Sequence, residues 1–221
     1  MAGRATKIKL EDTDPLQDFL MSLRDYAAEN SRRLLLIAAV VIGACLLVCG
    51  WFFYDRYGEK KADVLYRAAF LKEKANDMEE AVKQYESLLN QYPRTSAASF
   101  ASYRLGNYSL REEKFDEAVR FYQGFINKVA DSNDLKTLAW GGIGAAYERK
   151  NDLRQALIAY EKALVTPPLN AFQSINYQNA ARIHEKLDDK AKSLEYYEKA
   201  LEMESDPGTK IMIRRKIALL S

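Results

Sequence analysis

The sequence is poor in the residues that build catalytic and metal centres. It has one His and two Cys in 221 residues, and both Cys lie in a single apolar run. Thiol enzymes, zinc sites and Ser-His-Asp centres need these residue types, so the chain offers little material for them. Ten Gly and five Pro are too few for a collagen-like or low-complexity chain. With 33 basic and 31 acidic residues the net charge is +2, which does not indicate a nucleic-acid binder.

Charge is also missing from one continuous stretch, residues 34–54, which contains no Asp, Glu, Lys or Arg. A helix of this length spans about 30 Å, the thickness of the hydrocarbon core of a bilayer. Arg32 and Arg33 stand before the stretch and Asp55 and Arg56 follow it. The aromatic residues 51–54 suit the headgroup interface at one end. The stretch therefore predicts a transmembrane helix over residues 34–54.

Two alternatives treat the same stretch as a targeting signal. A cleaved signal peptide needs a short leader, a shorter apolar core and a small-residue cleavage site, and this leader is 33 residues long. Residues 42–45, Ile-Gly-Ala-Cys, resemble a lipoprotein box, although nine apolar or small residues follow Cys45. We favour the uncleaved helix, with lipidation of Cys45 as the open alternative.

The charges around the stretch do not fix its orientation. The preceding 20 residues carry three Arg or Lys and the following 20 carry six, which by a simple count would place the C-terminal part in the cytoplasm. The rule loses force for long domains, however, and residues 55–221 form one. We expect the N-terminus inside and the C-terminal domain outside; the absence of Cys from residues 55–221 is compatible with an oxidising compartment.

The leader, residues 1–33, contains one helical pattern. Asp14 and Pro15 are residues typical of a helix start, and apolar residues follow at the spacing of one helix face, at Leu16, Phe19, Leu20 and Leu23. This pattern predicts a short amphipathic helix. It is either a separate helix on the cytoplasmic membrane surface or on a partner, or the first turns of one long helix.

The rest of the chain repeats itself four times. A small residue recurs at spacings of 37, 38 and 37, and a Tyr follows each of them four residues later, on the same helix face. A second helical pattern precedes each of these segments, so the unit is helix, turn, helix. We expect a linker at 55–61, four repeats within 62–207 (62–95, 99–132, 137–170 and 174–207) and a capping helix at 208–221.

These spacings resemble those of the tetratricopeptide repeat family. The third repeat carries the motif best, the second and first keep part of it, and the fourth is degenerate, with His184 at an aromatic position. The resemblance implies an all-α solenoid of helix-turn-helix units after one transmembrane helix. It also implies that a set of residues packs the repeats together: Ala81, Tyr85, Gly106, Ala118, Tyr122, Trp140, Gly144, Tyr147, Ala156, Tyr160 and Tyr197.

The order of short leader, single anchor and divergent repeats is similar to that of the ancillary subunits of the bacterial Sec translocon. This likeness implies a single-pass protein of the bacterial inner membrane with its repeats in the periplasm, assisting secreted proteins in a chaperone-like way. A structural adaptor of another envelope complex, in cell division or outer-membrane assembly, is the alternative.

In such arrays the first helix of each repeat lines a concave groove that binds protein segments. The resemblance places the peptide-binding groove at Tyr66, Phe70, Phe100, Tyr103, Asn107, Arg111, Arg149, Gln178 and Arg182. The aromatic residues of the first two repeats suit unfolded or peptide clients, unless they pack between repeats. Gly142 stands where a clamp for a terminal carboxylate would need Asn.

Other motifs give no chemistry. The run Trp-Gly-Gly-Ile-Gly at 140–144 lacks the Lys-Ser/Thr of a phosphate loop, and small residues there favour close helix packing. We interpret His184 as a packing residue. The sequence therefore predicts no enzyme, cofactor, metal, nucleic-acid partner or small-molecule substrate.

Overall fold

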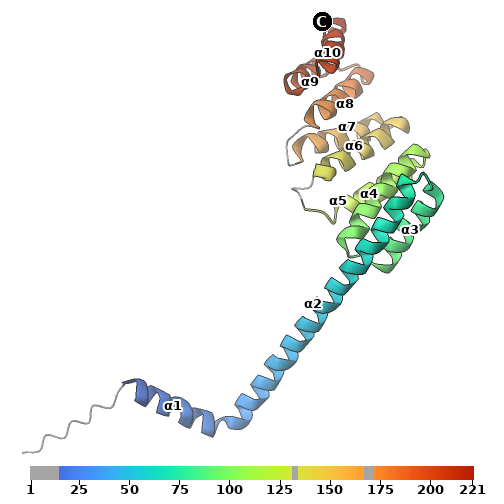
Figure 1. The fold of residues 1–221 in the computed structure, drawn as a ribbon. Coiled ribbons are helices and arrows are strands. Elements are labelled where there is room, and N and C mark those ends of the chain that lie inside the picture. Colours follow the sequence, from blue (N-terminus) through green and yellow to red (C-terminus); the bar gives the residue numbers. More distant parts are fainter. Residues whose placement is uncertain (1–14, 131–133, 167–171) are drawn as a thin grey trace, which may run out of the picture. The chain divides into compact units, whose positions relative to one another are not determined.

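The computed structural model describes residues 15–130, 134–166 and 172–221, and the described residues form helices and no strands. The chain divides into two compact units, residues 1–55 and 56–221 (Figure 1). We describe each unit by itself. Asp14 and parts of two links between repeats, 131–133 and 167–171, lie outside the described residues.

The first unit contains α1, Pro15–Glu29, and the first part of α2, Ser31–Lys74. Asn30 separates the two helices, so the predicted amphipathic segment is a helix of its own. Its apolar face is exposed: Leu16 is 63% and Phe19 is 60% accessible to solvent.

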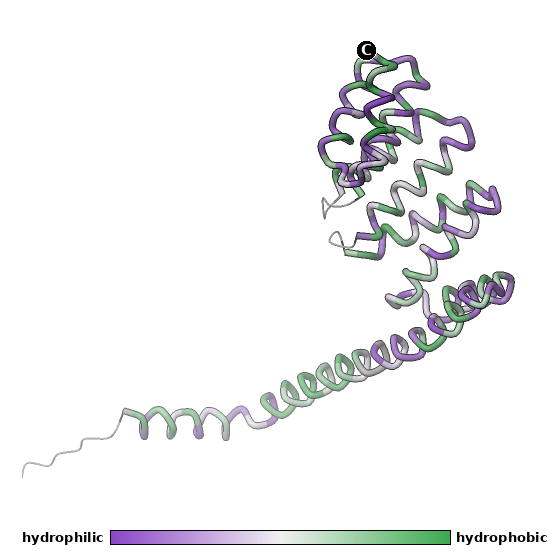
Figure 2. Tube along the Cα trace, turned by 45° about the horizontal axis from the view of Figure 1, so that its top comes forward, coloured by the Kyte–Doolittle hydropathy of each residue, from purple (hydrophilic) through white to green (hydrophobic). Residues whose placement is uncertain are grey.

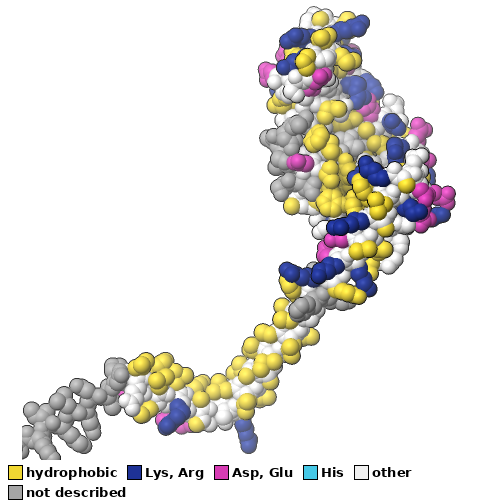
Figure 3. Space-filling model, viewed as in Figure 1, with side chains coloured by type: hydrophobic (Ala, Val, Ile, Leu, Met, Phe, Trp, Pro, Cys, Tyr) yellow, Lys and Arg dark blue, Asp and Glu magenta, His cyan; other side chains and the backbone are white. Residues whose placement is uncertain are grey.

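Helix α2 is, by length and composition, able to cross a membrane, and its apolar stretch is a continuous hydrophobic segment (Figures 2 and 3). Within residues 34–52, whose side chains the structure describes, none is buried. Leu47 is 77% exposed, and both Cys residues are free and exposed. A core helix of a soluble protein would bury such residues, and these are exposed.

The second unit is a stack of antiparallel helix pairs. The end of α2 pairs with α3, Met78–Gln91; α4, Ser96–Arg111, with α5, Phe115–Ile126; α6, Asp134–Arg149, with α7, Leu153–Val165; and α8, Gln173–Lys186, with α9, Lys190–Met203. A last helix, α10, Pro207–Leu220, packs on α9. This architecture confirms the predicted all-α repeat solenoid (Figure 1).

One prediction about the boundaries was wrong. Residues 55–61, expected as a linker, are helical and belong to α2. The Ser96 backbone N–H donates to the Glu59 carboxylate over 3.0 Å, and Gly58 lies against the Tyr92 ring. The stretch lacks Pro and has these contacts available, so the helix continues and the array begins before residue 62.

The turn inside each repeat has the same backbone. Asn76, Glu113, Asn151 and Asp188 all have φ between 60° and 62°. In the first repeat the N–H of Asn76 donates to the Glu73 carbonyl and that of Asp77 to the Lys72 carbonyl, which is the Schellman arrangement. Asn and Asp tolerate the left-handed region better than other non-Gly residues, and Glu113 is the exception among the four.

The small residue and the Tyr of each repeat form the interior. Ala81, Ala118, Ala156 and Ser193 are fully buried, and the four tyrosines Tyr85, Tyr122, Tyr160 and Tyr197 are at most 4% exposed. A Cβ atom at Gly144 would stand 2.6 Å from the Tyr160 ring, and one at Gly106 would stand 2.8 Å from the Tyr122 ring. Gly is therefore required at both sites because the ring occupies the space of its side chain.

Close packing also explains the glycine run at 140–144. A Cβ atom at Gly142, in α6, would lie 2.5 Å from the Tyr122 ring of the preceding repeat. Trp140 and Tyr147 are half-buried and pack against the core clusters on either side of α6. The run joins repeats rather than binding a phosphate group.

Candidate protein-interaction surface

The buried tyrosines define the register of the surface that the first helices present. The hydroxyls of Tyr85, Tyr160 and Tyr197 donate to carboxylates 12 residues earlier, those of Glu73, Glu148 and Glu185. The position in the second repeat that corresponds to these glutamates is Leu110, and there the Tyr122 hydroxyl donates to Asn107 Oδ1 over 2.7 Å.

Two of the predicted groove residues stand one position away from this register, although both line hollows of this surface. Arg111 and Arg149 lie one residue beyond the position of Glu73 and Glu185, and both are exposed. The sequence interpretation missed Glu148 for the same reason. The spacing of 12 residues between Glu and Tyr, present in three of the four repeats, was the signal that could have found it.

The predicted aromatic residues of the first two repeats are brought together, but most of them take part in packing. Tyr66 lies 6.4 Å from Phe100 between ring centroids, and Phe100 lies 6.1 Å from the buried Phe125. Tyr103 contacts both Phe125, at 5.3 Å, and Tyr122, at 5.9 Å. Phe100 therefore bridges to the preceding repeat, and Tyr103 packs on the second helix of its own repeat.

Phe70 differs from the other three rings because it joins no core cluster. Its ring is stacked on Tyr66 at 6.4 Å on one helix face of α2. The Arg104 guanidinium lies 5.0 Å and the Lys74 ammonium 5.4 Å from its centroid. A half-buried ring covered by long, movable cations can exchange these contacts for those of a ligand.

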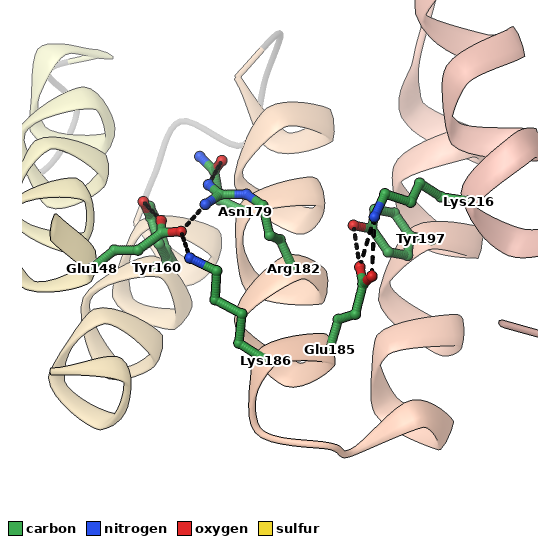
Figure 4. A network of polar contacts seen from close by, with 8 residues as sticks. All are labelled: Glu148, Tyr160, Asn179, Arg182, Glu185, Lys186, Tyr197 and Lys216. Carbon is green, nitrogen blue, oxygen red and sulfur yellow. Dashed lines mark hydrogen bonds and ion pairs between the residues drawn. The ribbon is translucent and has the colours of Figure 1, made fainter. Parts of the chain in front are cut away.

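The third and fourth repeats are joined on this face by a network of charged side chains. Glu148 accepts from Tyr160 over 3.1 Å, from Lys186 over 2.8 Å and from Arg182 (Figure 4). Arg182 also donates to Asn179 Oδ1 over 2.8 Å. The side chain of Glu148 is only 10% exposed, so this network is largely shielded from water.

The contact between the fourth repeat and α10 is built in the same way, with one cation instead of two. Glu185 accepts from Tyr197 over 3.3 Å and from Lys216, in α10, over 3.0 Å (Figure 4). In the first repeat Arg104 approaches Glu73 at 3.4 Å. Each of these three carboxylates thus connects its own second helix to the following repeat or cap.

The four buried tyrosines of the repeats are weaker acids than tyrosine in water. Burial raises the pKa of the Tyr160 phenol to about 12, and burial, followed by the Glu185 carboxylate, raises that of Tyr197 to about 12. Burial is also the main cause that raises the pKa of Tyr85 and of Tyr122. All four hydroxyls therefore stay protonated at neutral pH.

Three hollows lie along the first helices. One of about 370 Å³ is lined by α2, α3 and α4, with Glu73, Arg104 and Asn107 in its wall. A second, about 410 Å³, lies over Glu148 and Arg182. A third, about 510 Å³, is lined by α8, α9 and α10 and contains Gln178. The predicted Asn107, Gln178 and Arg182 thus line hollows, each of them half-buried.

The described residues contain no group of three or more His, Cys, Asp or Glu that could hold a metal ion. His184 is 3% exposed, with Nδ1 3.4 Å from an Asp189 carboxylate oxygen and its ring 5.1 Å from that of Tyr196. These are packing contacts of the kind expected for it. Electrostatics and shape along this surface suit the binding of other polypeptides.

One family profile described as tetratricopeptide repeat matches residues 63–95, and a second profile of the same description matches residues 138–164 and 176–207. The chain contains tetratricopeptide repeats. These matches fall on repeats 1, 3 and 4, and repeat 2 has the same pair of helices and the same left-handed turn. Such repeats are, in general, non-enzymatic scaffolds for interaction between proteins.

Solved structures show the same fold. A crystal structure of the MamA protein is similar, with a TM-score of 0.60 at 17% identity over 72% of this chain and 80% of that one. A MamA fragment from Desulfovibrio magneticus RS-1 gives 0.54 at 20% identity, covering 64% and 75%. PilF of Pseudomonas aeruginosa gives 0.56 at 17% identity, covering 74% and 69%. No curated protein sequence shows significant similarity.

Proposed function

We propose that this chain is a membrane-anchored interaction scaffold. In this proposal α2 spans the bacterial inner membrane, the leader is cytoplasmic, and the repeats assist secreted or envelope proteins in the periplasm beside the Sec translocon. The observation that carries it is the continuity of α2, which supplies both an unburied apolar stretch and the first helix of the array. A membrane tether raises the local concentration of the repeats where clients emerge.

Phe70 is the proposed anchor for apolar client segments in the first two repeats. It is half-buried and it joins no core cluster, unlike Phe100 and Tyr103. An exposed ring offers a large apolar area at low entropic cost. We expect weak binding, because ordering a disordered client costs several kcal/mol.

The test replaces Phe70 with a photo-crosslinking phenylalanine analogue in the full chain, in living bacteria, and identifies the adducts by mass spectrometry. Leu71, the next residue and 67% exposed, provides the matched position. Adducts with translocon subunits or secreted proteins at 70 and not at 71 support the proposal. Adducts only with cell-division or outer-membrane assembly proteins would instead support the structural adaptor.

The topology is tested separately. Protease added to intact spheroplasts should digest the repeats and leave a fragment that contains the leader and the anchor. Digestion only after lysis would place the repeats in the cytoplasm and remove the periplasmic role.

A further inference from the structure

Helix α10 exposes several apolar side chains. The solvent-facing side of a helix in a soluble domain is usually polar. In α10, however, Ile211, Met212 and Leu219 are 66%, 71% and 73% exposed. The helix carries Lys210, Arg214, Arg215 and Lys216, and residues 207–221 contain no Asp or Glu.

Part of this helix forms one wall of the 510 Å³ hollow. Met212, Arg215 and Leu219 lie along that wall, and Ile175 of α8, itself 53% exposed, also lines the hollow. The interior side is fixed by Tyr197 and Ile213, which are 4% and 1% exposed. The hollow thus combines a buried base with accessible apolar side chains contributed by two helices.

The charge around the hollow is not balanced. Arg182 and Lys186 share the single carboxylate of Glu148, and Lys216 pairs with Glu185. Arg215 has no partner among the residues that the structure describes, and no acidic residue lines the hollow. Arg182 and Lys216 line the hollow and have carboxylate partners, and the Asp206 carboxylate accepts from Thr209 in the same wall, so Arg215 is the cation that stands unpaired beside the apolar side chains.

From this arrangement we infer that the hollow between α8 and α10 binds an acidic amphipathic helix of a partner protein. The inference rests on the proposed scaffold function and names the chemistry of one partner. Apolar residues of such a helix at i, i+3, i+4 and i+7 would contact Ile175, Met212 and Leu219, and its carboxylates would pair with Arg215. Met side chains adapt readily to different apolar partners.

The charges and shape disfavour two other occupants. Pairing of α10 with α10 of a second copy would oppose two helices that are each basic and free of acidic residues, at an electrostatic cost. A lipid surface is flat and cannot fill a hollow with its base at Tyr197 and Ile213. A protein helix can satisfy both the shape and the charge.

The experiment measures binding to the full chain in phosphatidylcholine nanodiscs. The probe is a fluorescent 15-residue peptide with Leu at i, i+3, i+4 and i+7 and Glu at its polar positions; a matched peptide carries Lys instead. Empty nanodiscs provide the background. We expect the Glu peptide to bind at least about tenfold more tightly than the Lys peptide, with an affinity that falls as salt rises.

Arg215→Glu should weaken the Glu peptide about tenfold and improve the Lys peptide, because it reverses one charge of the wall. Arg154→Glu, the same change on an exposed residue of α7, is the control and should have no effect. Met212→Ser combined with Leu219→Ser should also cost about tenfold in affinity, since both side chains are exposed anchors. Ile158→Ser, on a side chain that is 44% exposed, is the matched apolar control.

Equal affinity for the two peptides, or equal loss in the Arg215 and Arg154 variants, would overturn the inference. So would protection of α10 from trypsin by phosphatidylserine vesicles without peptide binding, since that indicates a lipid-facing helix. Concentration-dependent dimers that Arg215→Glu strengthens would indicate a second copy instead. Crosslinks at position 70 are independent of all these outcomes, so the scaffold proposal stands or fails separately.

Discussion

The N-terminal pair of repeats (1 and 2) and the C-terminal pair (3 and 4) have the same interior packing. They differ in the side chains on the face that their first helices present. In the N-terminal pair, rings meet across the repeats, as Tyr66 and Phe100 do at 6.4 Å. In the C-terminal pair, Glu148 binds cations of the next repeat. The interior must hold one geometry, with a small residue against a tyrosine, whereas face positions are free to take the chemistry of a ligand. The comparison shows that ring contacts bridge repeats 1 and 2 in addition to the Glu73–Arg104 pair, whereas ion pairs bridge repeats 3 and 4.

The shared interior should be the costliest part to change. Tyr160→Ala removes a ring that is 1% exposed and fills the site beside Gly144, so we expect a loss of about 3–5 kcal/mol. Urea unfolding of the full chain in neutral detergent, followed by circular dichroism, measures it. Tyr160→Phe, which loses only the hydrogen bond to Glu148, is the control at about 1 kcal/mol. A loss below about 0.5 kcal/mol for Tyr160→Ala would show a surface residue.

The loss of stability on removing an ion-paired carboxylate between repeats should increase with the burial of that carboxylate. Glu148→Ala leaves a tyrosine hydroxyl and two cations without their acceptor, at a cost of about 2–3 kcal/mol. Glu185 is 35% exposed against 10% for Glu148, so the same change at Glu185 should cost less, below about 1 kcal/mol. The same unfolding assay compares the two variants. Equal losses would mean that shielding from water does not distinguish the junctions.

The junction between the two halves depends on a glycine. Gly142→Ala places a methyl group 2.5 Å from the Tyr122 ring, and we expect a loss of about 1–3 kcal/mol from the displaced ring. Gly141→Ala is the matched control, because its Cβ would meet only Asn176 Oδ1, at 3.5 Å. Similar stability of the two variants would show that the halves can separate slightly without cost.

The buried tyrosines make stability depend on alkaline pH. Because burial raises the pKa of Tyr160, the folded protein keeps the phenolic proton where the unfolded chain loses it. The contribution is complete below about pH 10, the ordinary tyrosine value, and it is lost as pH rises to about 12. We expect Tyr160 to account for about 1–2 kcal/mol of that loss, at about 1.4 kcal/mol per pKa unit less some solvent screening. Unfolding curves from pH 9 to 12 for the unaltered chain and Tyr160→Phe measure it; identical slopes would contradict the assignment.

The smallest effect concerns the turns. Glu113 adopts φ of 60° where the other repeats have Asn or Asp, so Glu113→Gly should stabilise the fold by about 0.5–1 kcal/mol. Asn151→Gly at the equivalent turn should gain less, since Asn already tolerates this conformation. Thermal unfolding of the two variants distinguishes them, and destabilisation by Glu113→Gly would show that its side chain has a role of its own.

Much of the architecture was predictable because its signals are local. The charge-free stretch at 34–54 lies in one helix, and the recurring small residues and tyrosines all fall in the second helices of the repeats, α3, α5, α7 and α9. Each signal acts over one or two helical turns, where the 3.6-residue period decides which side chains share a face. The buried positions Ala81, Tyr122 and Tyr160 follow from that period alone.

The surface depended on contacts over longer distances. Sequence spacing could not separate Phe70, which joins no core cluster, from Phe100, which rests on Phe125, because both are aromatic residues in the first helix of a repeat and the helical period does not show which ring meets a neighbouring helix. It also could not pair Glu148 with Arg182, 34 residues later. Which residue of the next repeat reaches a given side chain depends on the rotation between repeats, which the packing of glycines such as Gly142 against a neighbouring ring sets. The sequence determined the helices and their buried faces, and the tertiary structure decided which exposed residues meet.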